Sequence, residues 1–191
     1  MRLFVGVELP PDIRSQIDRA VEKLRTRLRR SCPRLDARWV ESDKLHITLW
    51  FLGEAADGRL SALNTALEQP FRTAAFPVRL SGFGAFPPSG PARVIWIGIP
   101  QGGVELRSLN AEITERVVPL GFEPERRSFA AHLTVARVRD PQSARGRAVR
   151  GTLDAESAAL PTFSVTSVTL FRSRLSPKGS QYEALLRVPL S

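Results

Sequence analysis

The sequence has little of several residue types on which common architectures and catalytic sites depend. Its 191 residues include a single cysteine, Cys32, so no disulfide can form within the chain. No apolar run is long enough to cross a membrane, and the N-terminus lacks the apolar stretch and cleavage site of a secretory signal. These absences predict a cytoplasmic protein in a reducing compartment, without membrane contact.

Histidine is also scarce, and its two copies stand in the same short motif. His46 and His132 are each followed two positions later by threonine, at Thr48 and Thr134. Ten residues are threonine, so chance would supply one such threonine about one time in twenty and both about once in 400. The period of two along a strand places each histidine and its threonine on one face, opposite apolar neighbours. The two motifs therefore predict one site that is built twice.

The charge balance favours an anionic ligand. The chain has 28 basic and 19 acidic residues, for a formal charge of +9, and only three of the basic residues are lysine. The preference for arginine over lysine is what a GC-rich genome produces, but codon bias does not explain the excess of basic residues. A field of this sign attracts RNA or phosphate esters. A basic cluster from Arg25 to Arg30 ends the first expected helix, where it suits either the helix dipole or RNA contact.

Hydrophobic periodicity predicts an α+β fold in a single domain spanning residues 1–191. A strand, a helix and a histidine strand occur in the same order in both halves of the chain, which predicts two lobes around a central cleft. We also expect residues 37–40 to pair with the first histidine strand. Within that strand, strict alternation of side chains puts Trp50 on the same face as Thr48 and Phe51 on the face toward the core. Strands are expected at 2–8, 45–52, 76–86, 92–99, 129–138, 162–175 and 181–190, and helices at 12–30, 58–69 and 104–120, with a hairpin turn at 176–179.

Two matched histidines suit a reaction that needs one proton donor and one acceptor near neutral pH. Cleavage of a phosphodiester has this need, because one group activates the attacking oxygen while the other protonates the oxygen that leaves in line with it. The threonine hydroxyls can donate to the non-bridging phosphate oxygens. Zinc spacing, a nucleophile elbow and glycine-rich phosphate or dinucleotide loops do not occur, and a Ser-His-Asp triad is not excluded.

Several blocks of sequence around these motifs resemble the bacterial and archaeal RNA 2′,3′-cyclic phosphodiesterases of the 2H phosphoesterase superfamily, historically called 2′-5′ RNA ligases. The likeness covers nearly the whole chain, and the paired motifs are its specific part. Trp50 and Ala131 depart from the pattern, since relatives often have a basic residue and a proline at these positions. The blocks are residues 2–10, 45–53, 93–98 and 129–137, with a tail containing Ser173, Leu175, Gly179 and Tyr182.

The resemblance implies two antiparallel sheets flanked by helices, with a phosphate bound between the motifs. It implies hydrolysis of a terminal 2′,3′-cyclic phosphate to a 2′-phosphate, with no metal and no cofactor. His46 is then the acid on the departing 3′-oxygen and His132 the base for water, while Thr48, Thr134 and Arg137 bind the phosphate. Trp50 either stacks on a base or closes the wall of the cleft.

The expected partner is RNA with a 2′,3′-cyclic phosphate end, or a related nucleotide, and the expected oligomeric state is a monomer. Two alternatives stay open at this point. One is a 2′-5′ RNA ligase or phosphodiesterase that uses the same site, and the other is a non-catalytic RNA-binding protein.

Overall fold

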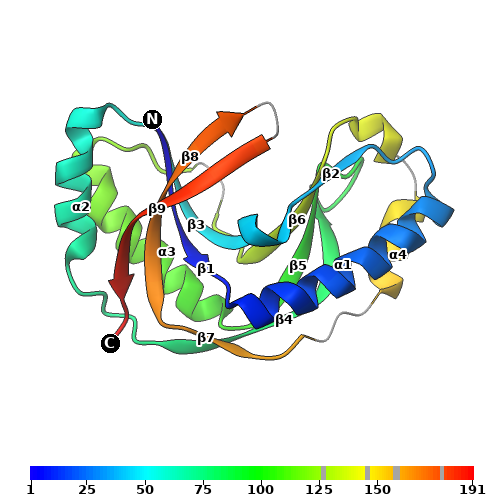
Figure 1. Cartoon of the computed structure of the whole chain (residues 1–191), viewed down its shortest axis with the longest axis horizontal. Coiled ribbons are helices and arrows are strands. Elements are labelled where there is room, and N and C mark those ends of the chain that lie inside the picture. The colour runs from blue at the N-terminus through cyan, green and yellow to red at the C-terminus, as the bar shows by residue number, and fades with distance from the viewer. Residues whose placement is uncertain (126–127, 145–146, 157–159, 177–178) are drawn as a thin grey trace.

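The computed structural model describes residues 1–191 except 126–127, 145–146, 157–159 and 177–178. Two antiparallel sheets form its centre, with strand orders β3-β1-β8-β9 and β2-β6-β5-β4-β7. The two sheets face each other across the middle of the molecule, and helices cover their outer sides (Figure 1). The predicted α+β fold of two lobes is confirmed.

The first sheet contains β1 (Arg2–Glu8), β3 (His46–Glu54), β8 (Ser167–Ser176) and β9 (Gly179–Pro189). The second contains β2 (Ala37–Trp39), β4 (Phe76–Phe86), β5 (Val94–Gln101), β6 (His132–Val138) and β7 (Phe163–Val165).

The helices form where apolar periodicity and end signals agree. Helix α1 starts with proline in its first turn and an acidic residue, Asp12, near its positive end, and it buries one apolar stripe. Helix α3 is extended by a short 3-10 turn and stops at Gly121, which adopts the left-handed conformation that favours glycine. Within the described ranges, no helix is long and apolar enough to span a bilayer. The α-helices are α1 (Pro11–Ser31), α2 (Leu60–Glu68), α3 (Gly103–Val117) and α4 (Arg147–Ala155), and 3-10 turns cover Ser42–Lys44, Asp57–Arg59, Val118–Leu120 and Pro141–Ala144.

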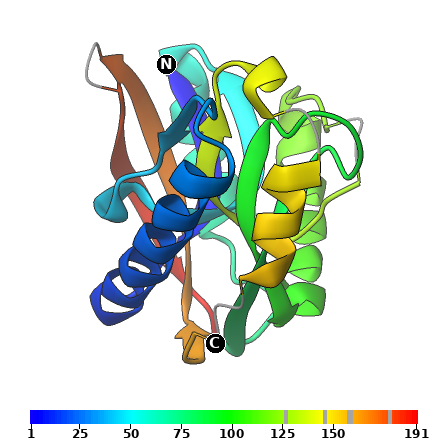
Figure 2. The same ribbon diagram turned by 90° about the vertical axis from the view of Figure 1, so that its right-hand side faces the viewer.

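Each long helix lies against the sheet of the opposite half of the chain. Helix α1 follows β1 but packs beside α4 on the second lobe, where the Ser31 and Thr152 hydroxyls are 2.8 Å apart (Figures 1 and 2). Helix α3 follows β5 but contacts β3, and Asn110 donates to the Leu49 carbonyl at 2.7 Å. Strands β1 and β3 are antiparallel neighbours, and an antiparallel pair does not need a crossover helix packed on its own sheet. The helix between them, α1, can therefore pack elsewhere. This exchange of helices favours the predicted single domain, which stays a prediction.

Two strand predictions were wrong. Residues 37–40 do not pair with the first histidine strand, because β2 pairs with β6, the second one. The segment 162–175 is not one strand either, since it breaks at Thr166 into β7 and β8, which belong to different sheets. In both places local periodicity reports an extended chain correctly but contains no information about which distant strand pairs with it. The 181–190 strand is confirmed as β9, paired with β8, while Pro177 and Lys178 of the expected hairpin turn lie outside the described residues.

Candidate active site

The two histidine strands contain the same irregularity at the same place. Along β3, Gly6 is opposite Thr48 but Val5 is opposite Trp50, so one extra residue is inserted between them. Along β6, Trp96 is opposite Thr134 while Ile95 is opposite Ala136, which inserts one extra residue in the same position of the motif. This is the two-against-one register of a β-bulge. The sequence repeat is therefore also a repeat of backbone geometry.

The bulge reverses the alternation of side chains in the second half of each strand. Before it, the histidines and threonines share the open face and their apolar neighbours are buried, as predicted. After it, Trp50 turns inward and is only 5% exposed, whereas Phe51 turns to the open face and is 46% exposed. The prediction that Phe51 packs in the core was therefore wrong. In β6 the same step buries Ala136 and brings Arg137 to the open face.

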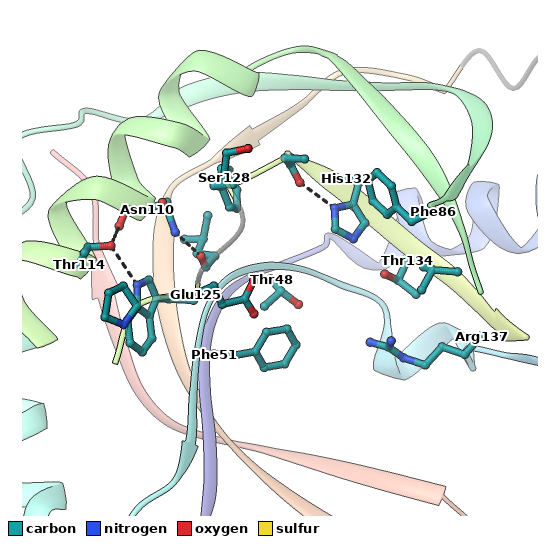
Figure 3. Close-up of a pocket in the computed structure, with 16 residues that line it drawn as sticks. Thr48, Phe51, Phe86, Asn110, Thr114, Glu125, Ser128, His132, Thr134 and Arg137 are labelled. Atoms are coloured by element: carbon teal, nitrogen blue, oxygen red, sulfur yellow. Dashed lines mark hydrogen bonds between the residues drawn. The ribbon is translucent and has the colours of Figure 1, made fainter. Parts of the chain in front are cut away.

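The open faces of β3 and β6 line a cavity of about 400 Å³. A volume of this size is typical of small-molecule sites. Thr48 and Phe51 from one sheet and His132, Thr134 and Arg137 from the other lie around the same space (Figure 3). The cavity extends under α3 and is also lined there by Trp50, Asn110, Thr114, Glu125 and Ser128. Five of the six predicted site residues thus line one cavity, and His46 lies next to them at the start of β3.

His46 is held by a carbonyl and by a layer of aromatic rings. Its Nδ1 is 2.8 Å from the Lys44 carbonyl oxygen, and its ring lies 4.7 Å from that of Phe4 and 5.0 Å from that of Tyr182. Gly6 is next to it on β1, where an added Cβ would come within 2.7 Å of the Ile47 carbonyl oxygen, so this close approach requires glycine. Burial in this layer lowers the pKa of His46 to about 4, so the imidazole is neutral at pH 7.

His132 repeats this arrangement on the other sheet. Its Nδ1 is 2.7 Å from the Ala130 carbonyl oxygen, and Phe86 packs edge-on against the ring at 5.0 Å. Burial lowers the pKa of His132 as well, and the carboxylate of Glu125 opposes that shift. In both motifs the carbonyl belongs to the residue two positions before the histidine. A carbonyl only accepts, so each Nδ1 is the protonated nitrogen and each Nε2 is left for a substrate.

Arg137 acts on both histidines. Its positive charge contributes to the lowered pKa of His46 and to that of His132. Figure 3 shows this side chain extending toward the space between β3 and β6. A guanidinium in this position can bind a phosphate that both histidines contact.

Helix α3 supports the bulge in β3 through side chains that were not predicted from the sequence. Asn110 donates to the carbonyl of the extra residue, Leu49, at 2.7 Å. The Thr114 hydroxyl donates to the Asn110 carbonyl at 2.7 Å and accepts from the Trp50 indole at 2.9 Å. Trp50 thus lines the cavity wall with its polar atom already bonded to protein, and its contact with substrate stays a prediction.

Phe51 and Glu125 are cavity residues that sequence reasoning missed. The repeat contained a signal for Phe51, because it stands five positions after the first histidine just as Arg137 stands five after the second. No comparable signal existed for Glu125, which lies outside both motifs. Within the described residues, no three histidine, cysteine or acidic side chains gather as a metal-ligand group would. The polar side chains at the cavity include those of Thr48, His132, Thr134 and Arg137.

Comparison with known proteins identifies the family of this chain. Residues 9–176 match the family model of the 2′-5′ RNA ligase superfamily. The chain belongs to that superfamily. It is 35% identical over 189 residues to the RNA 2′,3′-cyclic phosphodiesterase of Archaeoglobus fulgidus, covering 97% of this chain and 98% of the relative. It is 30% identical over 186 residues to the protein of the same name from Methanothermobacter thermautotrophicus, covering 95% of each.

Solved structures of this superfamily share the fold. Escherichia coli LigT complexed with 3′-AMP superimposes with a TM-score of 0.74 at 27% identity, covering all of this chain and 98% of LigT. The phosphate complex of LigT gives a TM-score of 0.69 at 26% identity, with 100% and 97% coverage. The ligands in these complexes are a nucleotide and a phosphate.

Proposed function

We propose that this protein hydrolyses the 2′,3′-cyclic phosphate end of RNA to a 2′-phosphate by acid–base catalysis with His46 and His132. The observation that carries the proposal is the doubled motif. Two strands with the same bulge and the same carbonyl-anchored histidine open toward one cavity, and the charge of Arg137 lowers the pKa of both imidazoles. The names of the relatives supply the substrate class.

In the proposed reaction, a water oxygen forms a bond to phosphorus while the bond from phosphorus to the 3′-oxygen breaks. One neutral imidazole takes the proton of the water, and the other imidazole, protonated, gives its proton to the 3′-oxygen. The two groups must lie on opposite sides of the phosphate, because attacking and leaving oxygens are in line. Histidines on two facing sheets suit this requirement. Family likeness assigns His46 as acid and His132 as base. Because His46 is neutral at pH 7 in the free protein, it has to take up its proton when the anionic phosphate binds beside it.

The threonines and Arg137 are proposed to stabilise the phosphate. Thr48 and Thr134 line the cavity on the same face as the histidines, where their hydroxyls can donate to non-bridging oxygens. Phe51 offers an exposed ring in the same cavity, on which the terminal base can stack. Phe51 and Arg137 stand at the same position of the repeat, five residues after a histidine. In this proposal the first half of the repeat therefore binds the base and the second half binds the phosphate.

The test of the proposal is a reaction of a short RNA with a 2′,3′-cyclic phosphate end in the presence of EDTA. The expected product is the 2′-phosphate, resolved from the 3′-phosphate by its resistance to a 3′-specific phosphatase. Tight RNA binding without ring opening would instead show a binding protein. Joining of the cyclic phosphate to a 5′-hydroxyl end of RNA, in place of release of the 2′-phosphate, would show the ligase alternative.

The first prediction concerns pH. Because both histidines have lowered pKa values in the free protein, the form with one charged imidazole is most populated between pH about 4 and the ordinary histidine value of about 6.5. We expect kcat/KM to be bell-shaped with its maximum in this acidic interval. A bound phosphate raises both pKa values, so the kcat profile should be displaced to higher pH. A kcat/KM that rises steadily from about pH 5 to 9 contradicts catalysis by the pair.

The second prediction concerns the threonines. Thr48→Val and Thr134→Val keep the β-branched shape and remove one donor to the phosphate. Loss of a hydrogen bond to a charged transition state is expected to cost about 2–4 kcal/mol in kcat/KM, with little change in thermal stability. Thr65→Val on α2 is the matched control, because Thr65 does not line the cavity. Unchanged kcat/KM in both cavity variants would show that the threonines do not contact the phosphate.

A further inference from the structure

The cavity is large enough for the terminal nucleotide, so the rest of an RNA strand must lie on the surface outside it. One described surface next to the cavity that has the chemistry for this is the edge of the second sheet. Strand β2 is the last strand on that side, and it pairs with β6, the strand containing the second histidine. An RNA strand leaving the cavity over β6 therefore reaches β2 next.

Arg38 extends the positive charge of the cavity along this path. It stands directly opposite Arg137 in the antiparallel register of β2 and β6. Residues opposite each other in such a pair are on the same face, with Cβ atoms about 5 Å apart. Arg38 is therefore an exposed cation on the cavity side of the sheet, one strand farther out than Arg137. Its charge also reaches Glu41, whose pKa it helps to lower.

The other face of β2 lines a second, basic groove. Ala37 and Trp39 alternate with Arg38 and turn to the side covered by the end of α1. There they line a groove of about 290 Å³ together with Arg25 and Arg29. The Arg25 guanidinium lies 5.6 Å from the centre of the Trp39 ring, and its buried Nε–H has no hydrogen-bond partner among the described residues. Such a combination of arginines with an aromatic ring is how single-stranded nucleic acids are commonly bound.

The helix dipole explains only part of this basic cluster. Arg25 and Arg27 have acidic partners, Glu22 at 3.0 Å and Glu156 at 2.7 Å. Arg29 is exposed and forms no ion pair with any of the described residues. A role in the helix dipole would not require an aromatic groove beside the arginines. The groove and Arg38 lie on opposite faces of the same three-residue edge strand, so one strand of ligand that passes around this edge can contact both.

We propose that RNA leaving the cavity crosses β2, with one backbone phosphate on Arg38 and the following nucleotides in the groove of Arg25, Arg29 and Trp39. We call these four residues the β2 rim. The inference rests on the proposed function for its ligand class. It means that the protein favours a polynucleotide with a cyclic phosphate end over a mononucleoside 2′,3′-cyclic phosphate.

The test compares these two substrates and adds a binding measurement. In the wild type, KM should be lower for the short single-stranded RNA than for the mononucleotide. Arg38→Gln and the double variant Arg25→Gln/Arg29→Gln should each reduce this preference roughly tenfold, the size expected for one charge-assisted contact. Arg107→Gln, on the exposed side of α3, is the matched control and should leave both KM values unchanged.

Binding of an RNA that already ends in a 2′-phosphate, measured by fluorescence anisotropy, tests the β2 rim without any reaction. The rim variants should weaken it, and each lost phosphate contact should reduce the slope of log Kd against log salt by about 0.7. An equal KM for both substrates, or rim variants with unchanged Kd and salt slope, would overturn the inference and leave the proposed hydrolysis intact. Failure of the wild type to open either substrate, with rim-dependent RNA binding, would overturn the hydrolysis alone.

Discussion

Replacing either histidine with alanine is expected to lower kcat by about 10²–10⁴-fold, the usual effect of losing a general acid or base. His46 and His132 are proposed to act on the two sides of one phosphate, so each step needs both. The double variant should therefore be little slower than the poorer single variant, because residues that act as a unit are strongly non-additive. The measurement is single-turnover ring opening with a short RNA at saturating protein.

Protein stability has to be separated from catalysis in these variants. His46 packs against Phe4 and Tyr182, so His46→Ala also leaves a cavity, whereas His46→Gln and His132→Gln retain more of the side-chain volume. Thermal unfolding of both sets shows how much of the loss comes from packing. Losses that multiply in the double variant, or one histidine that proves dispensable, would contradict a shared phosphate.

Replacing Arg137 with glutamine is expected to lower kcat/KM by about 10²–10³-fold, because a donor to the charged transition state is lost. The same change has a second, independent consequence. Arg137 lowers the pKa of both histidines, so its removal should raise both values and displace the acidic limb of the pH profile upward. The two imidazole titrations can be followed directly by NMR, since the chain has only two histidines.

Two matched substitutions make this prediction specific. Arg139→Gln changes an exposed arginine just beyond the end of β6, 3.8 Å from Asp36, and should leave activity and both pKa values unchanged. Arg137→Lys keeps the charge but loses the planar pair of donors, so the histidine pKa values should stay low while kcat/KM still falls. If Arg137→Gln behaves like Arg139→Gln, the guanidinium has no part in phosphate binding.

Elements with strong local signals were predictable from the sequence. Helix α1 has its apolar stripe and its end signals within one continuous segment, and the strands at 2–8 and 76–86 coincide with β1 and β4. Strand pairing was less accessible, because alternation shows that a segment is extended but not which distant segment it meets. Contacts between distant segments determine three features of the fold. Strand β2 pairs with β6, β7 and β8 belong to different sheets, and α1 and α3 each pack on the other lobe.

For the candidate site, the sequence by itself determined which polar residues share a face: two histidines and two threonines, at the spacing that puts each pair on one side of its strand. Tertiary structure decided which later residues join them. A strict period of two would place Phe51 and Arg137 in the core, and one inserted residue in each strand brings both to the cavity. The bulge in β3 is supported by Asn110, which is distant in sequence and reaches it only because α3 crosses to the first sheet. A bulge depends on hydrogen bonds between strands and with neighbouring helices, so no single segment of sequence reveals it.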